Sequence, residues 1–574
     1  MKVKRIFAAF MAAVFVSLAL SACGGNVEGT LTAGQPLMDD MDIMELLHSA
    51  NPVQASWPLV DTPTTLSFFA QVSGSTVEDL ETNDFTAWYS EQTGVNFDWR
   101  IVTSGAGQQI PLMIAGGDLP DVFLGNLNNM QVQTFAMLDN VFVPLTDSIM
   151  NHGPNIVNML VNEEQTRQWS FMPDGEIYSL LRVVDTLNER VTKRAWVYQP
   201  WLELLDLDLP NTTDEFYDML VRFRDEIPAL IGVDAIVPMA GAMQGAPANN
   251  EIESYILNAF LFYDRGDYLM VDENNVVHFV ANTEEYREGL RYLNKLFSEG
   301  LITDETWTQG RPGLMSMTEG QPQNMVGVVT AMFWGHFTTE GGPLGRDLEF
   351  VSVPALEGPG GVRWAFDRGM LVNNGMLVAT PANPNVDLTI QLVDWFFCPF
   401  GMMEAGYNSV LGPEGAGWRH AEPGELNPFG EQAQFAYLRA PDNRQNDNWF
   451  QVFPYYWPGD FVLRSFTDDD LNRKEAFGGN ETVKNYLPYS AFHLRMPFLH
   501  APFEFLDEFS RIADDIRNTT TGEVAMFRDR FITGQLCLDN DWQSYLSALN
   551  RAGLARYVEI NQIMLDRYLD MVGN

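Results

Sequence analysis

The sequence contains little cysteine and little positive charge. Only 3 of its 574 residues are cysteine, and 34 Lys and Arg stand against 76 Asp and Glu, which gives a formal net charge of −42. A surface this acidic repels phosphate backbones, so nucleic acid is not expected as a partner. After Cys23, only Cys398 and Cys537 remain, so one disulfide at most is possible. Two buried free thiols are favoured over that bond.

Sequence signatures of catalysis are also missing. The 7 histidines are scattered, with no His-Glu-x-x-His pair, no Gly-x-Ser-x-Gly elbow and no Gly-Lys-Ser/Thr phosphate loop. We therefore predict no enzyme, no metal site and no cofactor. Paired carboxylates for glycoside hydrolysis stay open among 76 acidic residues, because such a pair forms in space rather than in sequence. The run Asp468–Asp470 is interpreted as a solvated turn.

Long apolar runs are confined to the N-terminus. A basic start precedes the apolar run Ile6–Leu20, which is shorter than the roughly 20 residues that span a bilayer. This pattern is typical of a secretory leader over residues 1–22. The end of the run, Leu20-Ser-Ala-Cys23, resembles the lipobox of bacterial lipoproteins, which implies a lipid on Cys23 and anchoring at the outer face of the cell membrane. An ordinary leader followed by a chance cysteine is the alternative.

The chain beyond the leader alternates between strand and helix patterns. Residues 23–63 are small, polar and acidic, which predicts a tether and an arm with a short helix around Asp42–Leu47. In Thr64–Ala70, the side chains of Leu66, Phe68 and Ala70 share one face of a strand. The next elements are predicted as helix Asp79–Gln92, strand Val95–Val102, helix Gln108–Ala115 and strand Val122–Leu124. This order predicts an α/β fold with a parallel sheet.

Later segments continue the alternation. Thr212 and Glu215 have capping-box spacing and open a helix that is predicted to run through Phe223. Apolar residues at spacings of four, three and four predict helices that bury one face. The remaining predicted elements are strands Glu176–Val184 and Thr192–Tyr198, a hairpin of Tyr268–Asp272 and Val276–Val280, helices Tyr286–Phe297 and Val386–Phe397, and a helical C-terminus containing Trp542, Tyr545 and Leu549.

Several segments together resemble one protein family. They are Ile114–Asp121, Asp174–Tyr178, Trp196–Leu202, Pro210–Tyr217, Leu296–Ile302, Ala331–Gly335, Pro384–Phe397 and Phe531–Tyr568. In this order, and with the lipobox, they resemble the extracellular solute-binding lipoproteins of ABC importers, in the family-1 group that includes the maltose-binding protein. The large lipoprotein branch linked to oligosaccharide uptake is the most similar.

The resemblance implies an α/β, two-lobed periplasmic-binding-protein-like (type II) fold with a hinge and a central ligand cleft. The first lobe would take residues 64–180 and 376–470, and the second 181–375 and 471–574, with crossings near Leu180–Val184 and Met370–Val378. The resemblance also implies a monomeric receptor that binds a carbohydrate and delivers it to ABC permease subunits in the membrane.

The sequence departs from the family pattern at two places. Relatives often carry a calcium loop after the helix that Thr212 opens, but Arg224–Gly232 lacks the alternating oxygen ligands that calcium needs. We therefore predict no calcium site. The segment Trp418–Asp470 is rich in proline, asparagine and aromatic residues and matches the family least.

Candidate ligand residues follow from what a sugar requires. Aromatic rings stack on its C–H face and polar side chains bond its hydroxyl rim, in loops at the strand ends. Trp334 follows the apolar strand Val326–Ala331 and is our first choice, with a core tryptophan as the alternative. One of Trp196 and Tyr198 is expected in the core and the other in the cleft. The full set of candidates is Gln71, Ser73, Asp121, Asn126, Trp196, Tyr198, Trp334, Trp364, Asp367, Arg368, Trp418 and Trp457.

Alternatives stay open for the other candidates and for the protein as a whole. A surface position fits Trp364, Asp367 and Arg368 equally well, and packing within a loop would explain Trp418 and Trp457. No dense Lys/Arg cluster lies near the candidate loops, so a neutral or weakly charged oligosaccharide is expected. The lipid-anchored receptor is weighed against an extracellular carbohydrate-active enzyme or a glycan-adhesion module.

Overall fold

The computed structural model describes residues 40–572 apart from short internal segments. The segments outside the description are 73–76, 78, 126, 173, 244–249, 321, 340–341, 428–429, 439–445, 451, 462–463, 467–484, 493–504 and 519–521. The predicted leader, Cys23, the turn Asp468–Asp470 and the lobe boundary after residue 470 therefore lie outside the described residues. Among the described helices, none combines the length and the apolar composition that a bilayer crossing requires.

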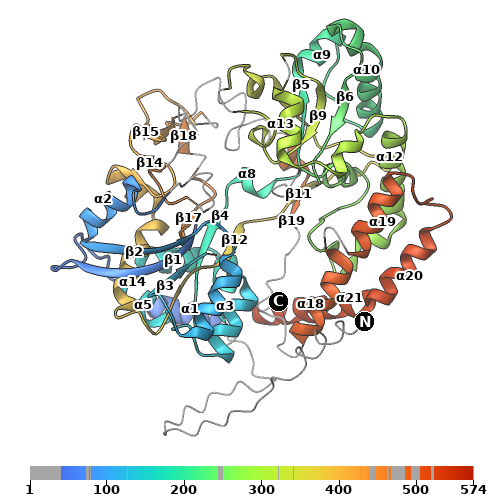
Figure 1. Ribbon diagram of the computed structural model, residues 1–574. Helices are drawn as coiled ribbons and strands as arrows, with labels where there is room; N and C mark the ends of the chain where they lie inside the picture. The colour runs from blue at the N-terminus through green and yellow to red at the C-terminus, as the bar shows by residue number, and fades with distance from the viewer. Residues whose placement is uncertain are drawn as a thin grey trace, which may run out of the picture. The chain divides into compact units, whose positions relative to one another are not determined.

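Six strands form a mixed sheet, and the first of them along the chain is the strand predicted at Thr64–Ala70 (Figure 1). They are β1 (Thr64–Gln71), β2 (Val95–Val102), β3 (Val122–Leu124), β4 (Leu180–Val184), β12 (Leu371–Ala379) and β17 (Tyr456–Trp457), in the order β17-β4-β12-β3-β1-β2. β1 pairs in parallel with β2 and β3, whereas β12 runs antiparallel to β3 and β4. The predicted parallel α/β arrangement is therefore confirmed for β1, β2 and β3. β17 was not predicted, because a two-residue strand has no measurable period.

The alternation within β1 separates two cores. Leu66, Phe68 and Ala70 enter one buried cluster, whereas Phe69 enters another together with Phe123 of β3. Successive side chains of a strand point to opposite faces, so each face of the sheet is covered separately. The face predicted for Leu66, Phe68 and Ala70 is confirmed.

Local sequence sets the ends of the helices around this sheet. α2 (Asp84–Thr93) begins later than predicted, because the Asn83 side chain accepts hydrogen bonds from the backbone N–H groups of Phe85 and Thr86. It ends at Gly94, whose φ of 76° favours glycine. The other helices here are α1 (Asp40–Ser49), which includes the predicted arm helix, α3 (Ala106–Gly116), α4 (Asn129–Gln133), α5 (Thr146–His152), α6 (Pro154–Asn162), α7 (Glu164–Ser170), α14 (Val386–Asp394) and α15 (Pro399–Glu404), with the π-helical turn η1 (Thr134–Leu138).

Four strands form a second sheet. They are β5 (Ala195–Tyr198), β6 (Val237–Ala240), β9 (Val326–Thr330) and β10 (Phe350–Val353), in the order β10-β5-β9-β6. β6 is parallel to β9, and β5 runs antiparallel to both β9 and β10. Around it lie α9 (Gln199–Leu205), α10 (Thr213–Ile231), α11 (Ile252–Ile256), α12 (Glu284–Ser298), α13 (Arg311–Glu319) and the predicted hairpin of β7 (Leu269–Val271) and β8 (Val277–Phe279).

The capping box at the start of α10 is confirmed. Thr212 Oγ1 accepts from the Glu215 N–H at 3.1 Å, and the Glu215 carboxylate accepts from the Thr212 N–H at 3.2 Å. The helix continues past its predicted end at Phe223, because Ile227 extends the same buried face. Residues 224–231 are consequently helical, and Gly232 caps them.

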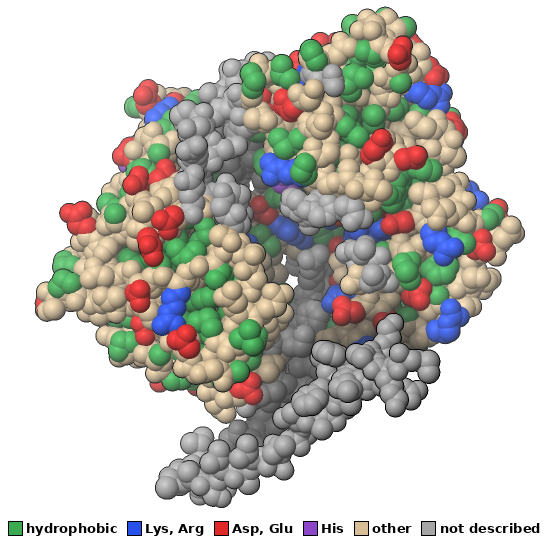
Figure 2. Space-filling view, viewed as in Figure 1, with side chains coloured by type: hydrophobic (Ala, Val, Ile, Leu, Met, Phe, Trp, Pro, Cys, Tyr) green, Lys and Arg blue, Asp and Glu red, His purple; other side chains and the backbone are tan. Residues whose placement is uncertain are grey.

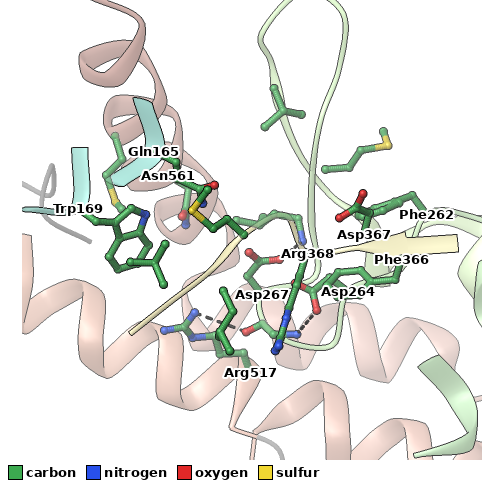
Figure 3. Close-up of a pocket in the computed structure, with 18 of the residues that line it drawn as sticks. Gln165, Trp169, Phe262, Asp264, Asp267, Phe366, Asp367, Arg368, Arg517 and Asn561 are labelled. Atoms are coloured by element: carbon green, nitrogen blue, oxygen red, sulfur yellow. Dashed lines mark hydrogen bonds between the residues drawn. The ribbon is translucent and has the colours of Figure 1, made fainter. Parts of the chain in front are cut away.

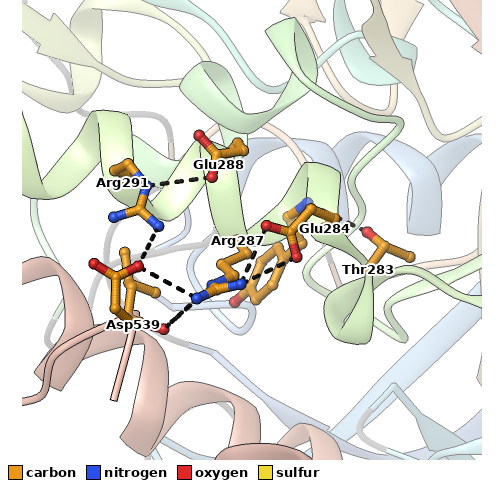
Figure 4. Close-up of polar contacts among 8 residues, drawn as sticks. Thr283, Glu284, Arg287, Glu288, Arg291 and Asp539 are labelled. Atoms are coloured by element: carbon orange, nitrogen blue, oxygen red, sulfur yellow. Dashed lines mark hydrogen bonds and ion pairs between the residues drawn. The ribbon is translucent and has the colours of Figure 1, made fainter. Parts of the chain in front are cut away.

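The C-terminal helices are α18 (Leu506–Arg517), α19 (Glu523–Ile532), α20 (Trp542–Ala552) and α21 (Leu554–Val572). They pack against one another, and two of them contact elements far away in the sequence: α19 packs against α12 and α21 against β8 (Figure 1). Between α19 and α20, Asp539 pairs with Arg287 and Arg291 of α12 at 3.3 and 2.8 Å (Figure 4). The hydrogen bond from Arg291 holds the pKa of Asp539 below its usual value. These contacts fix the end of the chain to the part of the fold that contains the four-stranded sheet.

Two stretches of the described chain, the joining stretches, run from one sheet to the other. One runs from β4 through α8 (Leu187–Arg190) to β5, and the other runs from β11 (Ala365–Asp367) into β12. β4 and β12 pair with each other from Val184 opposite Leu371, so both belong in full to the six-stranded sheet. The chain therefore leaves this sheet after Val184 and returns at Leu371.

The smaller sheets are short. β11 pairs with β19 (Ser490–Phe492), and β13 (Tyr407–Asn408) pairs with β14 (Gly412–Pro413). The segment that matches the family least contributes β17 and a three-stranded sheet of β15 (Trp418–His420), β16 (Phe435–Tyr437) and β18 (Ser465–Phe466).

The described surface mixes both signs of charge. Figure 2 shows acidic and basic side chains scattered over the viewed face rather than gathered by sign. Cys398 and Cys537 are both free thiols, as expected. The expectation that both are buried is wrong, because Cys398 is only half-buried and Cys537 lies in the exposed turn between α19 and α20.

Candidate functional site

A cavity of about 300 Å³ lies beside the second joining stretch (Figure 3). Its walls come from segments far apart in sequence: α7, the loop before β7, β11 with the start of β12, and helices α18 and α21. Its lining residues are Gln165, Trp169, Phe262, Asp264, Gly266, Asp267, Leu269, Met270, Val271, Phe366, Asp367, Arg368, Met370, Leu371, Val372, Phe509, Arg517, Asn561 and Met564. This combination of aromatic, apolar and polar groups is typical of a small-molecule site.

Aromatic rings lie at opposite ends of the cavity. Trp169 lies at one end, and Phe262 and Phe366 lie at the other, with ring centroids 6.1 Å apart (Figure 3). The Nζ of Lys193 lies 5.9 Å from the centroid of the Phe366 ring. The indole N–H of Trp169 is buried and has no hydrogen-bond partner among the described residues. A ligand hydroxyl near Trp169 would satisfy this donor.

The polar wall is held in place by local hydrogen bonds. The Asp264 carboxylate accepts from the Gly266 N–H at 2.9 Å, and the Asp267 carboxylate accepts from the Leu269 N–H at 3.0 Å. Arg517 of α18 donates to the Gly266 carbonyl at 3.5 Å. Each carboxylate has more than one lone pair, so these bonds orient the groups without exhausting them.

Two reciprocal ion pairs tie the joining stretches together beside the cavity. Arg190 donates through Nε and Nη2 to both oxygens of Asp367, at 3.1 and 2.8 Å. Arg368 donates to the backbone carbonyl and to the carboxylate of Glu189, and its N–H donates to the Arg190 carbonyl at 3.0 Å. Fork-like pairing of this kind fixes geometry as well as charge. Asp367 and Arg368 therefore line the cavity and also connect the two sheets.

Burial disfavours the charged forms of Asp185 and Arg190 beside the joining stretches. Asp185, which follows β4, lies 3.8 Å from Arg190 Nη1. Burial raises the pKa of Asp185 to about 6, although Arg190 opposes the rise, and Glu163 and Asp367 add to it. For Arg190, burial disfavours the charge, but its hydrogen bonds to Asp367, together with the negative charges of Asp367 and Asp185, outweigh that cost and raise the pKa. Asp185 thus carries its charge near neutral pH at a cost to the fold.

Of the ten predicted site residues that the structure describes, Asp367 and Arg368 line this cavity. Gln71 accepts from the Ala106 N–H at 3.0 Å and caps α3. Asp121 accepts from the N–H and hydroxyl of Ser67 at 2.7 and 2.9 Å, which ties β3 to β1. Ser73 and Asn126 lie outside the described residues.

The structure places five of the six aromatic candidates in cores. Trp334 is 2% exposed and belongs to the cluster around the four-stranded sheet, which favours its core alternative. The others are buried with their polar atoms satisfied or their rings stacked: Trp196 Nε1 donates to Ala331, Tyr198 bonds Glu349, Trp418 Nε1 donates to Gly412, and Trp457 stacks on Phe461. The split expected between Trp196 and Tyr198 is not seen, because both lie in strand β5 with four buried positions. Trp364 is the exception, at 39% exposure.

Sequence reasoning missed most of the cavity. Phe262, Asp264 and Asp267 come from the loop before β7, and Asn561 and Met564 come from α21. The stretch Asp264-Arg-Gly-Asp267 gives a turn signal but no signal of a site. The α21 residues lie on a helix whose partners are distant in the sequence, so no local pattern identifies them.

Comparison with known proteins gives a consistent result. The chain matches no protein-family model. It is 23% identical over 526 residues to the fructooligosaccharide ABC transporter substrate-binding protein FusA of Streptococcus pneumoniae, covering 88% of this chain and 90% of that protein. The polygalacturonan/rhamnogalacturonan-binding protein YtcQ of Bacillus subtilis is 24% identical over 218 residues, covering 35% of this chain and 39% of that protein.

Solved structures extend the likeness to the fold. FusA of S. pneumoniae in complex with kestose superposes with a TM-score of 0.71 at 22% identity, covering 88% of this chain and 99% of that one. A human-milk-oligosaccharide-binding, ABC-transporter-associated solute-binding protein from Bifidobacterium longum infantis gives a TM-score of 0.70 at 17% identity, covering 89% and 99%. These structures confirm the predicted α/β fold of a solute-binding protein, and the relatives are binding proteins rather than enzymes. The chain is similar in sequence to a substrate-binding protein of an ABC transporter and shares the fold of such proteins.

Proposed function

We propose that this protein is a lipid-anchored extracellular receptor that captures an oligosaccharide and delivers it to an ABC permease. The observation that supports a sugar ligand most directly is the cavity, in which aromatic rings and hydrogen-bonding side chains share one small space. Sugars need both, because their C–H faces stack on rings and their hydroxyls exchange hydrogen bonds. Relatives described as binding fructooligosaccharides, polygalacturonan or human-milk oligosaccharides support the same ligand class.

The charges around the cavity favour a neutral or weakly charged ligand. Asp264, Asp267 and Asp367 line it together with Arg368 and Arg517. Because Asp367 and Arg368 are already engaged in ion pairs of the joining stretches, a strongly anionic glycan would find few uncommitted positive groups there.

A glycan panel tests the receptor. Purified protein would be mixed with neutral and anionic oligosaccharides, and its melting temperature and heat of binding measured. A ligand that binds the folded state raises the melting temperature by mass action, and a receptor leaves it chemically intact. Binding of a neutral oligosaccharide without turnover supports the proposal, whereas cleavage of the sugar would favour the enzyme alternative.

The anchor is tested separately. Lipidation of Cys23 would hold the mature chain at the outer face of the membrane. Cys23→Ser removes the modified sulfur, so we expect the variant in the soluble fraction or as uncleaved precursor. If Cys23→Ser stays with membranes as the parent does, the anchor proposal is wrong.

Ligand capture would close two lobes over the sugar. The six-stranded and four-stranded sheets would form one lobe each, and the stretches 185–194 and 365–370 would bend as the hinge. A ligand shifts this equilibrium only through its differential affinity for the closed state. Small-angle scattering with and without a saturating ligand measures the change, and identical profiles would contradict closure.

A further inference from the structure

Trp364 is the most exposed tryptophan of the protein. The sequence contains 14 tryptophans, all within the described residues, and Trp364 alone is more than a third exposed, at 39%. We propose that Trp364 forms a stacking subsite beside the cavity and binds the part of an oligosaccharide that the cavity does not hold. This inference rests on the proposed function and adds a residue that makes affinity depend on ligand length.

The strand geometry directs Trp364 toward the cavity side. Trp364 immediately precedes β11, in which Phe366 lines the cavity. Side chains two positions apart in extended chain point to the same face, so Trp364 and Phe366 share that face. Phe262 of the cavity wall contacts both rings, with centroid separations of 6.1 Å to Phe366 and 6.5 Å to Trp364.

The three rings form a continuous row from the cavity to solvent. Phe366 and Phe262 are each 3% exposed, whereas Trp364 is open. Trp364 meets Phe262 edge-on, with an interplanar angle of 84°. An edge-to-face contact covers at most one face of the Trp364 ring, so it supports the ring from one side.

The backbone around Trp364 is held firmly enough to present the ring. The Trp364 N–H donates to the Asn258 carbonyl at 3.0 Å. The preceding Arg363 donates to the Tyr489 hydroxyl at 3.1 Å and to the Asn211 carbonyl at 2.8 Å. A fixed ring loses little entropy when a sugar stacks on it.

The size of the cavity explains why such a subsite is needed. A volume of about 300 Å³ is at the lower end of ligand pockets, so it holds one end of an oligosaccharide and not a long chain. The remaining sugar units must lie outside, where Trp364 offers an exposed aromatic surface continuous with the cavity wall. Trp364 should therefore contribute to the binding of long ligands and not of short ones.

The test compares ligand lengths across matched variants. Titration calorimetry would measure Kd for the parent, Trp364→Ala and Trp364→Phe with sucrose, kestose and nystose, and with maltose- and galacturonate-based di-, tri- and tetrasaccharides. Leu426→Ala removes an apolar side chain that is 47% exposed elsewhere on the protein and controls for the loss of surface apolar area. Melting temperatures would verify that each variant is folded.

We expect Trp364→Ala to weaken the longest ligand that binds by roughly 5- to 30-fold and to change the shortest by less than about twofold. Trp364→Phe should restore most of the loss, and Leu426→Ala should bind as the parent does. Equal weakening at every length, or none at any, would overturn the subsite and leave the receptor standing. If the parent binds no glycan of the panel, the proposed function fails, and the subsite fails with it.

Discussion

The cores around the two sheets bury different kinds of group. Beside the six-stranded sheet, Trp449 lies against Phe85 and Phe453 with ring centroids 4.8 and 4.6 Å apart. Beside the four-stranded sheet, Glu253 and Arg528 are just as buried, but they are charged, and they form an ion pair at 2.7 Å. Around Trp449 the core is stabilised by aromatic packing, whereas Glu253 and Arg528 each depend on an oppositely charged partner.

Substitutions in the two cores should consequently lower the free energy of unfolding by different amounts. Loss of part of a ring removes contacts in proportion to the volume lost, and neighbours relax partly into the space. Loss of one ion-pair partner leaves the other charge buried without compensation, which costs far more than the pair contributes. The predictions below test this contrast, from the largest expected effect to the smallest.

Arg528→Met should destabilise the protein most. The side chain of Arg528 is fully buried, and its guanidinium lies against Glu253, whose carboxylate is also buried. Methionine keeps most of the volume but removes the nearer cation, so that among the described residues Arg265, at 3.4 Å, remains as the partner of the carboxylate. We expect a loss of about 3–5 kcal/mol in the free energy of unfolding, measured by denaturant titration.

The double variant Glu253→Gln with Arg528→Met is the control for that loss. It removes both charges of the pair, so it should be more stable than Arg528→Met alone. A single variant as stable as the parent would show that Arg265 alone compensates the buried charge of Glu253.

Trp334→Ala should also destabilise, by about 3–4 kcal/mol, because the indole is buried in the four-stranded region. The same variant tests the sequence prediction that Trp334 stacks on a sugar. Thermal unfolding and glycan affinity would be measured together. A melting temperature near that of the parent, combined with weak glycan binding, would contradict the core position and restore Trp334 as a site residue.

Trp449→Phe should cost less, about 1–3 kcal/mol, since phenylalanine keeps a ring in the aromatic core of the six-stranded region. The indole N–H of Trp449 donates to the Thr86 hydroxyl at 2.8 Å, and its loss adds to the cost of the smaller volume. The double variant with Thr86→Val removes both partners of this bond. A loss as large as that of Arg528→Met would erase the proposed difference between the two cores.

Much of the fold could be predicted from the sequence, because local signals set it. The alternation of Leu66, Phe68 and Ala70 predicts β1 and its buried face, and the spacing of Thr212 and Glu215 predicts the start of α10. Where local signals compete, the predicted boundary is wrong. Asn83 caps α2, so this helix begins later than the predicted start at Asp79. Pairing of β17 with β4, and packing of α19 against α12, depend on contacts across the chain that no local period encodes.

The candidate site was much harder to predict. A tryptophan after a buried strand is compatible with core and cleft alike, and burial placed Trp334 in the core. Asp367 and Arg368 were identified as polar groups beside an apolar segment, but their partners Arg190 and Glu189 are distant in sequence. The cavity is assembled from five segments, so its residues share no motif.

Asp185→Asn should have the smallest effect, and it tests the junction between the two regions. Burial raises the pKa of Asp185 from 3.8 to about 6, despite the opposing charge of Arg190. The folded state therefore binds this proton more tightly than the unfolded chain does, so the free energy of unfolding falls as pH rises from about 4 to about 6 and stays lower above that. Asparagine cannot ionise, so the variant lacks this pH dependence. Burial also raises the pKa of Asp394 to about 6, but Asp394 is present in both proteins, so its contribution cancels in the comparison. We expect the variant to gain about 1–2 kcal/mol relative to the parent at pH 7 and almost nothing at pH 4. Denaturant titrations of both proteins across this range measure the difference, and a variant less stable than the parent at pH 7 would show that the Arg190 contact outweighs the cost of burial.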